Sequence, residues 1–257
     1  MRFSEIRPEY EEQMLGWIAP VGRDAFVGRR VLDAGCGKGR HLRLASAFGA
    51  KEVIGIDLGP AVDAAAENTA DLDKVHVVQG DLTHPPLRPA SIDLIYSIGV
   101  LHHLGEPEAG FRALAPLLVP GGRFVVWLYA REGNGWVLTL VDPARRLKPA
   151  AAAAGERTRA RPHGAALDCA APALRAGANA PEARAALPYS SYLRDLVPFP
   201  FREVHSIAFD QFLAPVAHYM ERPRVARCFA EGGITLDSLR WHHANSWAAS
   251  GTRSEAR

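Results

Sequence analysis

The stretch that decides the fold of this chain runs from residue 31 to residue 40 and reads Val31-Leu32-Asp33-Ala34-Gly35-Cys36-Gly37-Lys38-Gly39-Arg40. Its apolar beginning gives way to glycines at every second position, and residues 41–48 are compatible with a helix. This order predicts a strand, a tight turn and a helix. Glycine has no Cβ and tolerates positive φ, and a helix N-terminus presents unpaired N–H groups. We therefore expect a nucleotide-like ligand to lie close to this turn.

The spacing of the glycines and the negative charge of Asp33 indicate which kind of nucleotide the turn would bind. A dinucleotide site has the pattern G-x-G-x-x-G, but Arg40 stands where the third glycine would be. Asp33 would repel a pyrophosphate and attract an ammonium or sulfonium group. The D-x-G-x-G-x-G pattern resembles motif I of the class I S-adenosylmethionine-dependent methyltransferases. A glycine-rich turn without a ligand is the alternative. The resemblance implies S-adenosylmethionine as the cofactor and, as residues that bind it, Asp33, Gly35, Cys36, Gly37 and Gly39.

Residues 52–57 predict a second strand that ends in an acid. This short run is rich in β-branched residues and ends at Asp57, and a Gly59-Pro60 break follows it. A carboxylate at the end of the strand after the glycine loop is placed to accept hydrogen bonds from both ribose hydroxyls. A strand-terminal Asp is also a common helix cap. We expect ribose binding here, with Leu58 as a neighbouring cofactor contact.

A third strand is predicted over residues 74–79, and Gly80-Asp81-Leu82 follows it. In class I methyltransferases an acid at this place bonds the adenine amino group, and an adjacent backbone N–H reaches a ring nitrogen. The resemblance therefore implies these two contacts for Asp81 and Leu82. A turn acid without a ligand is the alternative.

Residues 92–98 predict the fourth strand, and the loop after it carries two adjacent histidines. Ligands of open α/β sheets lie beyond the carboxyl ends of the strands, where the first and fourth strands flank the switch point. We therefore expect Ser97 to contact the cofactor and the loop up to His103 to face the transferred methyl. His102 or His103 is a candidate general base, and packing or loop ordering is the alternative. We expect no metal, because neighbouring histidines should diverge and no Cys or His cluster has ligand spacing.

Turn residues and apolar runs in the second half of the chain predict the remaining strands of the sheet. Pro120-Gly121-Gly122 predicts a sharp stop before a fifth strand over residues 123–129. Runs at 234–241 and 246–249 predict a final antiparallel pair at one edge of the sheet. Strands that alternate with helices imply a doubly wound α/β fold. The expected fold is a mostly parallel, seven-stranded, Rossmann-like methyltransferase sheet with a helical cap insertion.

Two further motifs and a change of composition divide the chain. Residues 97–103, SIGVLHH, and 245–247, NSW, resemble those of an uncharacterised bacterial group of class I methyltransferases. Residues 149–187 are rich in Ala, Arg, Gly and Pro and offer little to a core. The expected parts are a helical lead-in over 1–27, a cofactor-binding core over 28–130, a cap over 131–222 and a last helix with the strand pair over 223–257.

Composition limits the partners. The 30 Lys and Arg nearly balance the 28 Asp and Glu, which argues against nucleic acid or an anionic membrane as partner. Three unpaired-looking cysteines, no apolar run of membrane length and no signal-peptide core at residues 1–20 fit a soluble, cytoplasmic protein. We expect a methyltransferase that acts on a small-molecule acceptor. A non-catalytic nucleotide-binding scaffold and, third, an NAD(P)-dependent oxidoreductase stay open.

Overall fold

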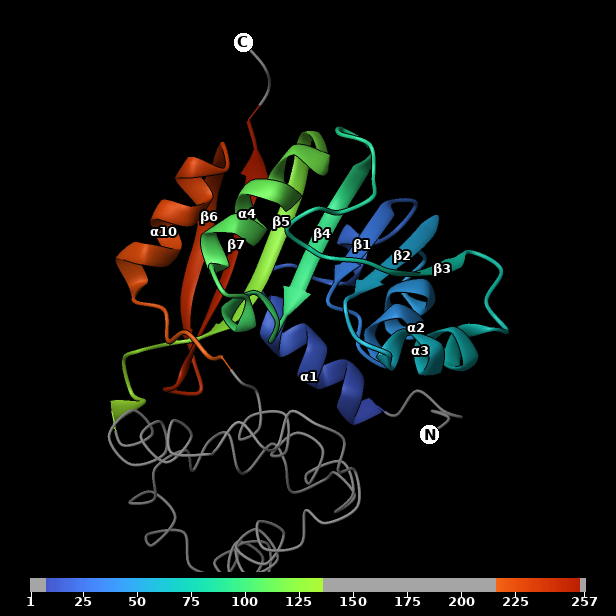
Figure 1. The fold of residues 1–257 in the computed structure, drawn as a ribbon, viewed down its shortest axis with the longest axis horizontal. Helices are drawn as coiled ribbons and strands as arrows, with labels where there is room; N and C mark the ends of the chain where they lie inside the picture. Colours follow the sequence, from blue (N-terminus) through green and yellow to red (C-terminus); the bar gives the residue numbers. More distant parts are fainter. Residues whose placement is uncertain (1–7, 136–215, 255–257) are drawn as a thin grey trace, which may run out of the picture. The chain divides into compact units, whose positions relative to one another are not determined.

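The computed structural model describes residues 8–135 and 216–254. The chain divides into two compact units, residues 1–132 with 216–257 and residues 133–215, and the first is described below. Its helices and strands are, in chain order, α1 (Pro8–Ile18), η1 (Arg23–Ala25), β1 (Arg30–Ala34), α2 (Arg40–Ala47), β2 (Glu52–Asp57), α3 (Ala61–Thr69), β3 (Val75–Gln79), β4 (Ile92–Ile98), η2 (Leu101–His103), α4 (Pro107–Leu114), η3 (Ala115–Leu117), β5 (Leu118–Tyr129), α10 (Arg222–Glu231), β6 (Ile234–His242) and β7 (Ser246–Arg253) (Figure 1).

The strands form one seven-stranded sheet in the order β3-β2-β1-β4-β5-β7-β6. Strands β1 to β5 pair in parallel, whereas β7 runs antiparallel to both β5 and β6. This confirms the mostly parallel sheet and the antiparallel pair at its edge. The predicted cap and low-complexity segment fall largely on residues 136–215 and so lie outside the described residues.

The start of β5 differs from the prediction. The strand begins at Leu118, which pairs with Ile92, and the register then jumps to Arg123 opposite Leu94. Residues 119–122, with Gly121 at φ 76°, therefore form an irregularity within the strand instead of a stop before it. A Pro-Gly-Gly sequence can interrupt a ladder without ending it, because the paired segments on both sides hold the strand in place.

Prolines mark where several helices begin. Pro8 and Pro107 are the first residues of α1 and α4, and Pro223 lies in the first turn of α10. Proline lacks an N–H and has a helical φ, so it is well suited to the first turn, where that N–H would have no partner within the helix. No helix within residues 8–135 and 216–254 has the length and apolar character that a membrane span needs.

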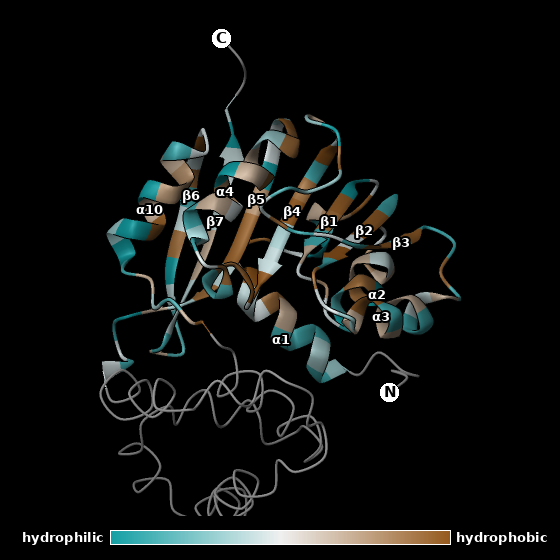
Figure 2. Cartoon of the chain, in the orientation of Figure 1, coloured by the Kyte–Doolittle hydropathy of each residue, from teal (hydrophilic) through white to brown (hydrophobic). Residues whose placement is uncertain are grey.

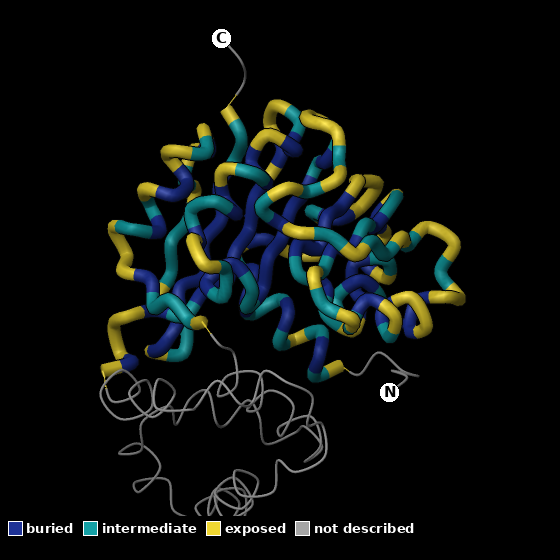
Figure 3. The backbone as a smooth tube through the Cα atoms, viewed as in Figure 1, coloured by how far each residue is buried: buried dark blue, intermediate teal, exposed yellow. Residues whose placement is uncertain are grey.

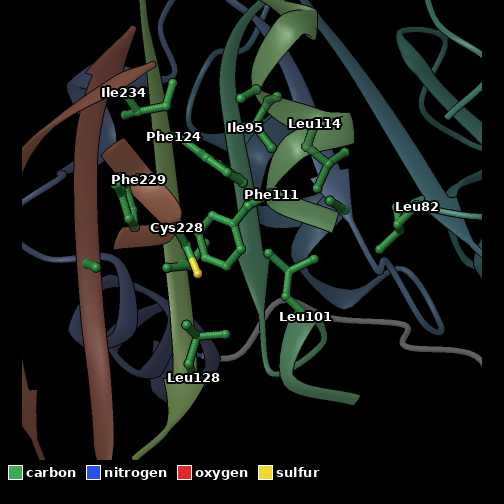
Figure 4. Packing of buried hydrophobic residues seen from close by; sticks show 14 of the residues in the cluster. Leu82, Ile95, Leu101, Phe111, Leu114, Phe124, Leu128, Cys228, Phe229 and Ile234 are labelled. Carbon is green, nitrogen blue, oxygen red and sulfur yellow. The ribbon is translucent and has the colours of Figure 1, made fainter. Parts of the chain in front are cut away.

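One face of the sheet is closed by an apolar core beneath α4 and α10. The rings of Phe111 from α4, Phe124 from β5 and Phe229 from α10 have centroids 5.4–5.9 Å apart (Figure 4). The central strands are brown in the hydropathy view, and they are dark blue where burial is drawn (Figures 2 and 3). Burial of this kind stabilises the fold by about 25 cal/mol per Å² of apolar surface.

The opposite face carries the polar side chains of interest and is covered by α1 and α2. A Cβ on Gly55 of β2 would lie 2.8 Å from Leu42 of α2, so that helix packs directly on the sheet. Trp17 of α1 lies against Trp127 of β5, with 5.2 Å between the ring centroids. Arg240 of β6 donates to the carbonyl oxygens of Gly16 and Ala19 at the end of α1. The last hairpin therefore holds the first helix on this face.

Candidate functional site

The glycine loop between β1 and α2 lies at the carboxyl end of β1, between β2 and β4. Gly35, Gly37 and Gly39 all have positive φ, at 100°, 51° and 85°. The backbone N–H groups of Gly35 and Cys36 donate to the Ile56 carbonyl, which fixes the loop to the end of β2. A Cβ on Gly37 would meet nothing within 4 Å. Hydrogen bonds to β2 thus hold the loop, and space remains beside Gly37.

The Asp57 carboxylate binds the glycine loop. One oxygen accepts the Gly37 N–H at 2.9 Å and the other accepts the Gly59 N–H at 2.9 Å. Each carboxylate oxygen has a second lone pair, so these bonds leave capacity for ribose hydroxyls. The carboxylate therefore orders the loop and its own turn and remains able to bind a ligand. It does not cap α3, whose N-cap is Pro60 without a side-chain hydrogen bond, so the helix-cap alternative is wrong.

Asp33 is a buried carboxylate with no hydrogen-bond partner among the described residues. It is 1% exposed, and both of its oxygens lack a donor. Burial, and then the nearby negative charge of Asp57, raise its pKa from 3.8 to about 8, although the neighbouring Tyr96 hydroxyl opposes the rise. Tyr96, which is opposite Asp33 in the β1–β4 register, is fully buried, and among the described residues its hydroxyl has no partner with hydrogen-bond geometry. A buried acid without a donor costs stability and is suited to a cationic ligand.

The predicted adenine contacts lie at the ends of β2 and β3 and differ in exposure. The Asp81 carboxylate accepts the Thr83 N–H at 2.8 Å, and this bond lowers its pKa. Leu82 is 4% exposed and belongs to the apolar core, so its side chain is not available to a ligand. Leu58 is 67% exposed beside Asp57. The Cys36 thiol is buried, and its pKa is raised by that burial.

A side chain at the end of β4 links the two central strands, β1 and β4. The Ser97 hydroxyl is fully buried and donates to the Ala34 carbonyl at 2.7 Å. This bond ties β4 to the end of β1 beside the glycine loop. Ser97 therefore joins the carboxyl ends of these two strands, and its proposed cofactor contact can use only the remaining lone pairs of its hydroxyl.

The two histidines of η2 occupy different environments. Their ring centroids lie 4.2 Å apart, so the expectation that they diverge is wrong; a 3-10 turn places both rings around Tyr129. His102 is fully buried, its ring lies 3.9 Å from that of Tyr129, and burial lowers its pKa well below the usual value. His103 is half-buried, and its Nδ1 lies 2.8 Å from the Val216 carbonyl oxygen.

Aromatic side chains of α1 and β5 cover this face, and Trp127 among them was not recognised from the sequence as part of the site. The Arg40 guanidinium lies 5.0 Å from the Tyr10 ring and 6.0 Å from the Trp17 ring, which connects α1 to the glycine loop. The Trp127 indole N–H is buried and has no partner within the described part of the chain. Trp127 could have been found from strand alternation, because it lies near the end of β5 and, like Asp33 and Tyr96, on the face covered by α1 and α2.

Metal-ligating side chains do not gather in this part of the molecule. Within the described ranges, no three His, Cys, Asp or Glu side chains are arranged as a metal site. His102 and His103 are close to one another, but no carboxylate or thiol in these ranges joins them to complete such a group.

The part of the chain that contains the glycine loop is similar to known proteins. The methyltransferase domain family matches residues 32–126. The tRNA U34 carboxymethyltransferase of Idiomarina loihiensis is 33% identical over 129 residues, which are 48% of this chain and 39% of that protein. The ubiquinone biosynthesis O-methyltransferase of Pseudomonas putida is 31% identical over 152 residues, covering 57% of this chain and 64% of that protein. This chain thus spans less than two thirds of either relative.

Among solved structures, an S-adenosylmethionine-dependent methyltransferase from Mesorhizobium loti superposes with a TM-score of 0.57 at 20% identity. The match covers 97% of this chain and 100% of that one, and at this identity it shows the fold. Together with the family match, it places the glycine loop and the ends of β1, β2 and β4 in a known architecture. Residues 32–126 therefore match a methyltransferase domain, and the fold of the chain is that of the class I, S-adenosylmethionine-dependent methyltransferases.

Proposed function

We propose that this protein binds S-adenosylmethionine and transfers its methyl group to a small-molecule acceptor. The observation that carries the proposal is the buried Asp33 carboxylate, which has no cationic partner among the described residues and lies beside an open glycine loop. The donor's ammonium group would supply the missing charge and N–H donors. An anionic pyrophosphate would instead add negative charge next to Asp33 and Asp57, which disfavours the NAD(P) alternative.

The other donor contacts follow from the ends of β2 and β3. Asp57 would accept the ribose hydroxyls with its remaining lone pairs, and Asp81 would accept the adenine amino group. The exposed Leu58 side chain would cover the base, while Leu82 would contribute its backbone N–H. The bound donor supplies an electrophilic methyl group on a cationic sulfur. The protein's own task is to hold the acceptor's nucleophile about 3–3.5 Å from that methyl, to exclude water and, where needed, to take a proton.

The acceptor is a small molecule in this proposal. The balanced charge of the chain, a formal +2, lacks the excess of Lys and Arg that phosphate contacts require. The ubiquinone biosynthesis O-methyltransferase supports this choice, whereas the tRNA U34 carboxymethyltransferase is a relative that acts on RNA by its name. Titration with bulk tRNA at 50 and 200 mM salt separates the two. Binding that is specific and survives the higher salt would replace the small-molecule acceptor.

Donor binding should release a proton at neutral pH. With a pKa of about 8, roughly nine-tenths of the Asp33 carboxyls are protonated at pH 7 before the ligand arrives. An ammonium group at this carboxyl lowers its pKa, so binding releases up to one proton and affinity rises up to about tenfold per pH unit until pH 8. Calorimetry with S-adenosylhomocysteine in phosphate and in Tris measures that proton from the difference in heat.

The control for this titration is 5′-methylthioadenosine, which keeps the nucleoside and lacks the ammonium and carboxylate. Its binding heat should be the same in both buffers after the usual correction for ligand protonation. If the binding heat of S-adenosylhomocysteine is also independent of the buffer, Asp33 does not meet the ammonium group. If neither ligand binds while the protein is folded, the donor site itself is refuted and the scaffold alternative stands.

Asp57→Ala should weaken binding of S-adenosylhomocysteine by about 1–3 kcal/mol, or about 5- to 150-fold. The substitution removes the expected ribose acceptor and also the acceptor for the Gly37 and Gly59 N–H groups. Calorimetry at pH 8 measures the affinity. The matched control is Asp63→Ala, which removes one carboxylate from α3. Unchanged affinity in Asp57→Ala would remove this residue from the binding site.

His102 and His103 are the proposed source of a general base, since both follow the carboxyl end of β4. A base is needed only when the acceptor carries a proton on its nucleophile, so positioning contributes to every acceptor and proton transfer only to some. The two rings lie in different environments, since His102 is fully buried and His103 is half-buried.

A further inference from the structure

Two buried polar side chains are neighbours on the central strands β1 and β4, and the proposed function uses only one of them. Asp33 and Tyr96 are partners in the parallel register of these strands, so both side chains lie on the same face of the sheet. Asp33 is 1% exposed and Tyr96 is fully buried. Within the described residues, neither the carboxylate oxygens nor the phenol hydroxyl has a hydrogen-bond partner. An acceptor and a donor are therefore buried next to one another without a bond.

The ring of Tyr96 is held in place by packing. The centroid of the fully buried Phe26 ring lies 5.9 Å from it, and that of the His41 ring, on α2, lies 6.5 Å from it. A phenylalanine would fill the same space without the cost of a buried hydroxyl that has no partner in the described part of the chain. Packing therefore explains the ring of Tyr96 but gives no reason for its hydroxyl.

The protonation of this pair follows from its surroundings. Burial, and then the negative charge of Asp33, raise the pKa of Tyr96 well above its ordinary value, so the hydroxyl keeps its proton. A carboxylate only accepts, so the hydroxyl is the donor whenever Asp33 is ionised. The same hydroxyl opposes the rise that burial causes in the pKa of Asp33. The other ionisable groups that β2, the glycine loop, α2 and α1 bring to this face are Asp57, Cys36, Arg40, His41 and Tyr10.

On the basis of the donor binding proposed above, we propose that Tyr96 is a positioning residue for the methyl donor, whose hydroxyl donates to the ionised Asp33 carboxylate and orients it toward the ammonium group. An ionised carboxylate has about four acceptor positions, so the phenol and the ammonium group can bind the same carboxylate without competing. The proton that Asp33 loses when the ligand binds goes to the buffer, and no covalent bond to carbon changes. Tyr96 thus acts through Asp33 and needs no contact with the reacting atoms.

Urea unfolding of the ligand-free protein tests the pair by itself, with Asp33→Asn made in the wild type and in Tyr96→Phe. Since the pKa of Asp33 is about 8, the stabilisation by Asp33→Asn in the wild type should change only about twofold, as an unfolding equilibrium constant, between pH 8 and pH 9.5. Without the hydroxyl, ionisation of Asp33 should move up by about one to two pH units, and that change should be about tenfold or more. Equal changes in the two backgrounds would overturn the proposal. Tyr96→Phe should fold, because the lost hydroxyl makes no hydrogen bond among the described residues.

Calorimetry with S-adenosylhomocysteine tests the role of Tyr96 in donor binding. Tyr96→Phe leaves more of the Asp33 carboxyls protonated, so the affinity at pH 8 should fall about 5- to 50-fold, and the proton release should rise from about half a proton to about one. At pH 9.5 the difference in affinity should narrow to less than about fourfold. An affinity loss that is equal at both pH values, with unchanged proton release, would mean that the hydroxyl only shapes the site and would refute the proposal.

Two controls accompany this titration. The affinity of Tyr96→Phe for 5′-methylthioadenosine, which lacks the ammonium group, should stay within about twofold of that of the wild type. Tyr219→Phe removes a hydroxyl from a ring that stacks on Tyr129 at the end of β5, and it should leave the affinity for S-adenosylhomocysteine and the proton release unchanged.

Failure of the donor site and failure of the Tyr96 proposal give different results. If S-adenosylhomocysteine does not bind the folded wild type, the proposed donor site and the role of Tyr96 in it are refuted, whatever the unfolding experiment shows. If the ligand binds the wild type with proton release, but Tyr96→Phe changes neither that release nor the pH dependence of unfolding, only the role of Tyr96 is refuted.

Discussion

Asp33→Asn should make the ligand-free protein more stable and should abolish most of its affinity for the donor. The carboxyl has a pKa of about 8 in the folded protein and an ordinary value of 3.8. A group whose pKa is raised on folding disfavours the folded state increasingly as pH rises from its unfolded value to its folded value. Asparagine keeps the shape and cannot ionise, so this cost disappears.

The stability difference between Asp33→Asn and the wild type should therefore depend on pH. It should increase by about 4 kcal/mol between pH 5 and pH 8 and level off above pH 8, because one pKa unit corresponds to 1.36 kcal/mol. In a chain of this size, that corresponds to a difference in Tm on the order of 10 °C. Thermal unfolding of both proteins at pH 5, 6.5, 8 and 9 measures it. Asp73→Asn, in the exposed turn before β3, should show no comparable trend.

The same variant should bind S-adenosylhomocysteine on the order of 100-fold more weakly at pH 8, because the ammonium group loses a charged, desolvated acceptor. The opposite signs of the two effects are diagnostic. A stabilised protein that still binds tightly would mean that the ammonium group is held elsewhere. A destabilised protein would mean that Asp33 has a partner that offsets its burial.

Gly35→Ala should destabilise the protein by about 3–5 kcal/mol. The residue has φ 100°, a conformation that alanine adopts only with strain, and a Cβ there would lie 2.2–2.7 Å from the side chain of Val100. Val100 directly precedes η2, so the clash would also displace the turn that carries the histidines. Urea unfolding at pH 7.5 measures the loss.

Gly37→Ala is the matched control for Gly35→Ala. Gly37 also has positive φ, 51°, but a Cβ there would meet no atom of the described residues within 4 Å. It should therefore cost only about 1–2 kcal/mol of stability and mainly weaken donor binding, by occupying the open space of the loop. The double variant Gly35→Ala/Val100→Ala should recover the part of the loss that is due to the clash. Equal losses in the two single variants would show that contact with Val100 is unimportant.

Local patterns in the sequence predicted the framework. The order of strands and helices, the glycine loop and the acids at the ends of β1 and β2 all follow from periodicity and turn chemistry, which depend on residues close together in the chain. The start of β5 was misplaced for the same reason. Its first residues are held by Ile92 on β4, a contact that the Pro-Gly-Gly stretch does not reveal.

The candidate site could be predicted only in part. Asp33, Asp57 and Asp81 could be identified as polar groups at strand ends, and their roles stay predictions. The sequence did not show that Asp33 has no partner within the described residues, that the Leu82 side chain is buried or that Ser97 already binds the Ala34 carbonyl. Each of these depends on what neighbouring strands and helices bring within a few ångströms.

The sequence by itself therefore determined the class of fold, the glycine loop and the acids at the strand ends, because these are encoded by short-range spacing. Only the tertiary structure decided the pKa of Asp33, since burial depends on the whole sheet and on α1, which Arg240 holds from 221 residues away. It also separated His102 from His103. Adjacent residues with the same side chain differ here because the His102 ring is enclosed beside Tyr129 of β5, whereas the His103 ring meets the Val216 carbonyl.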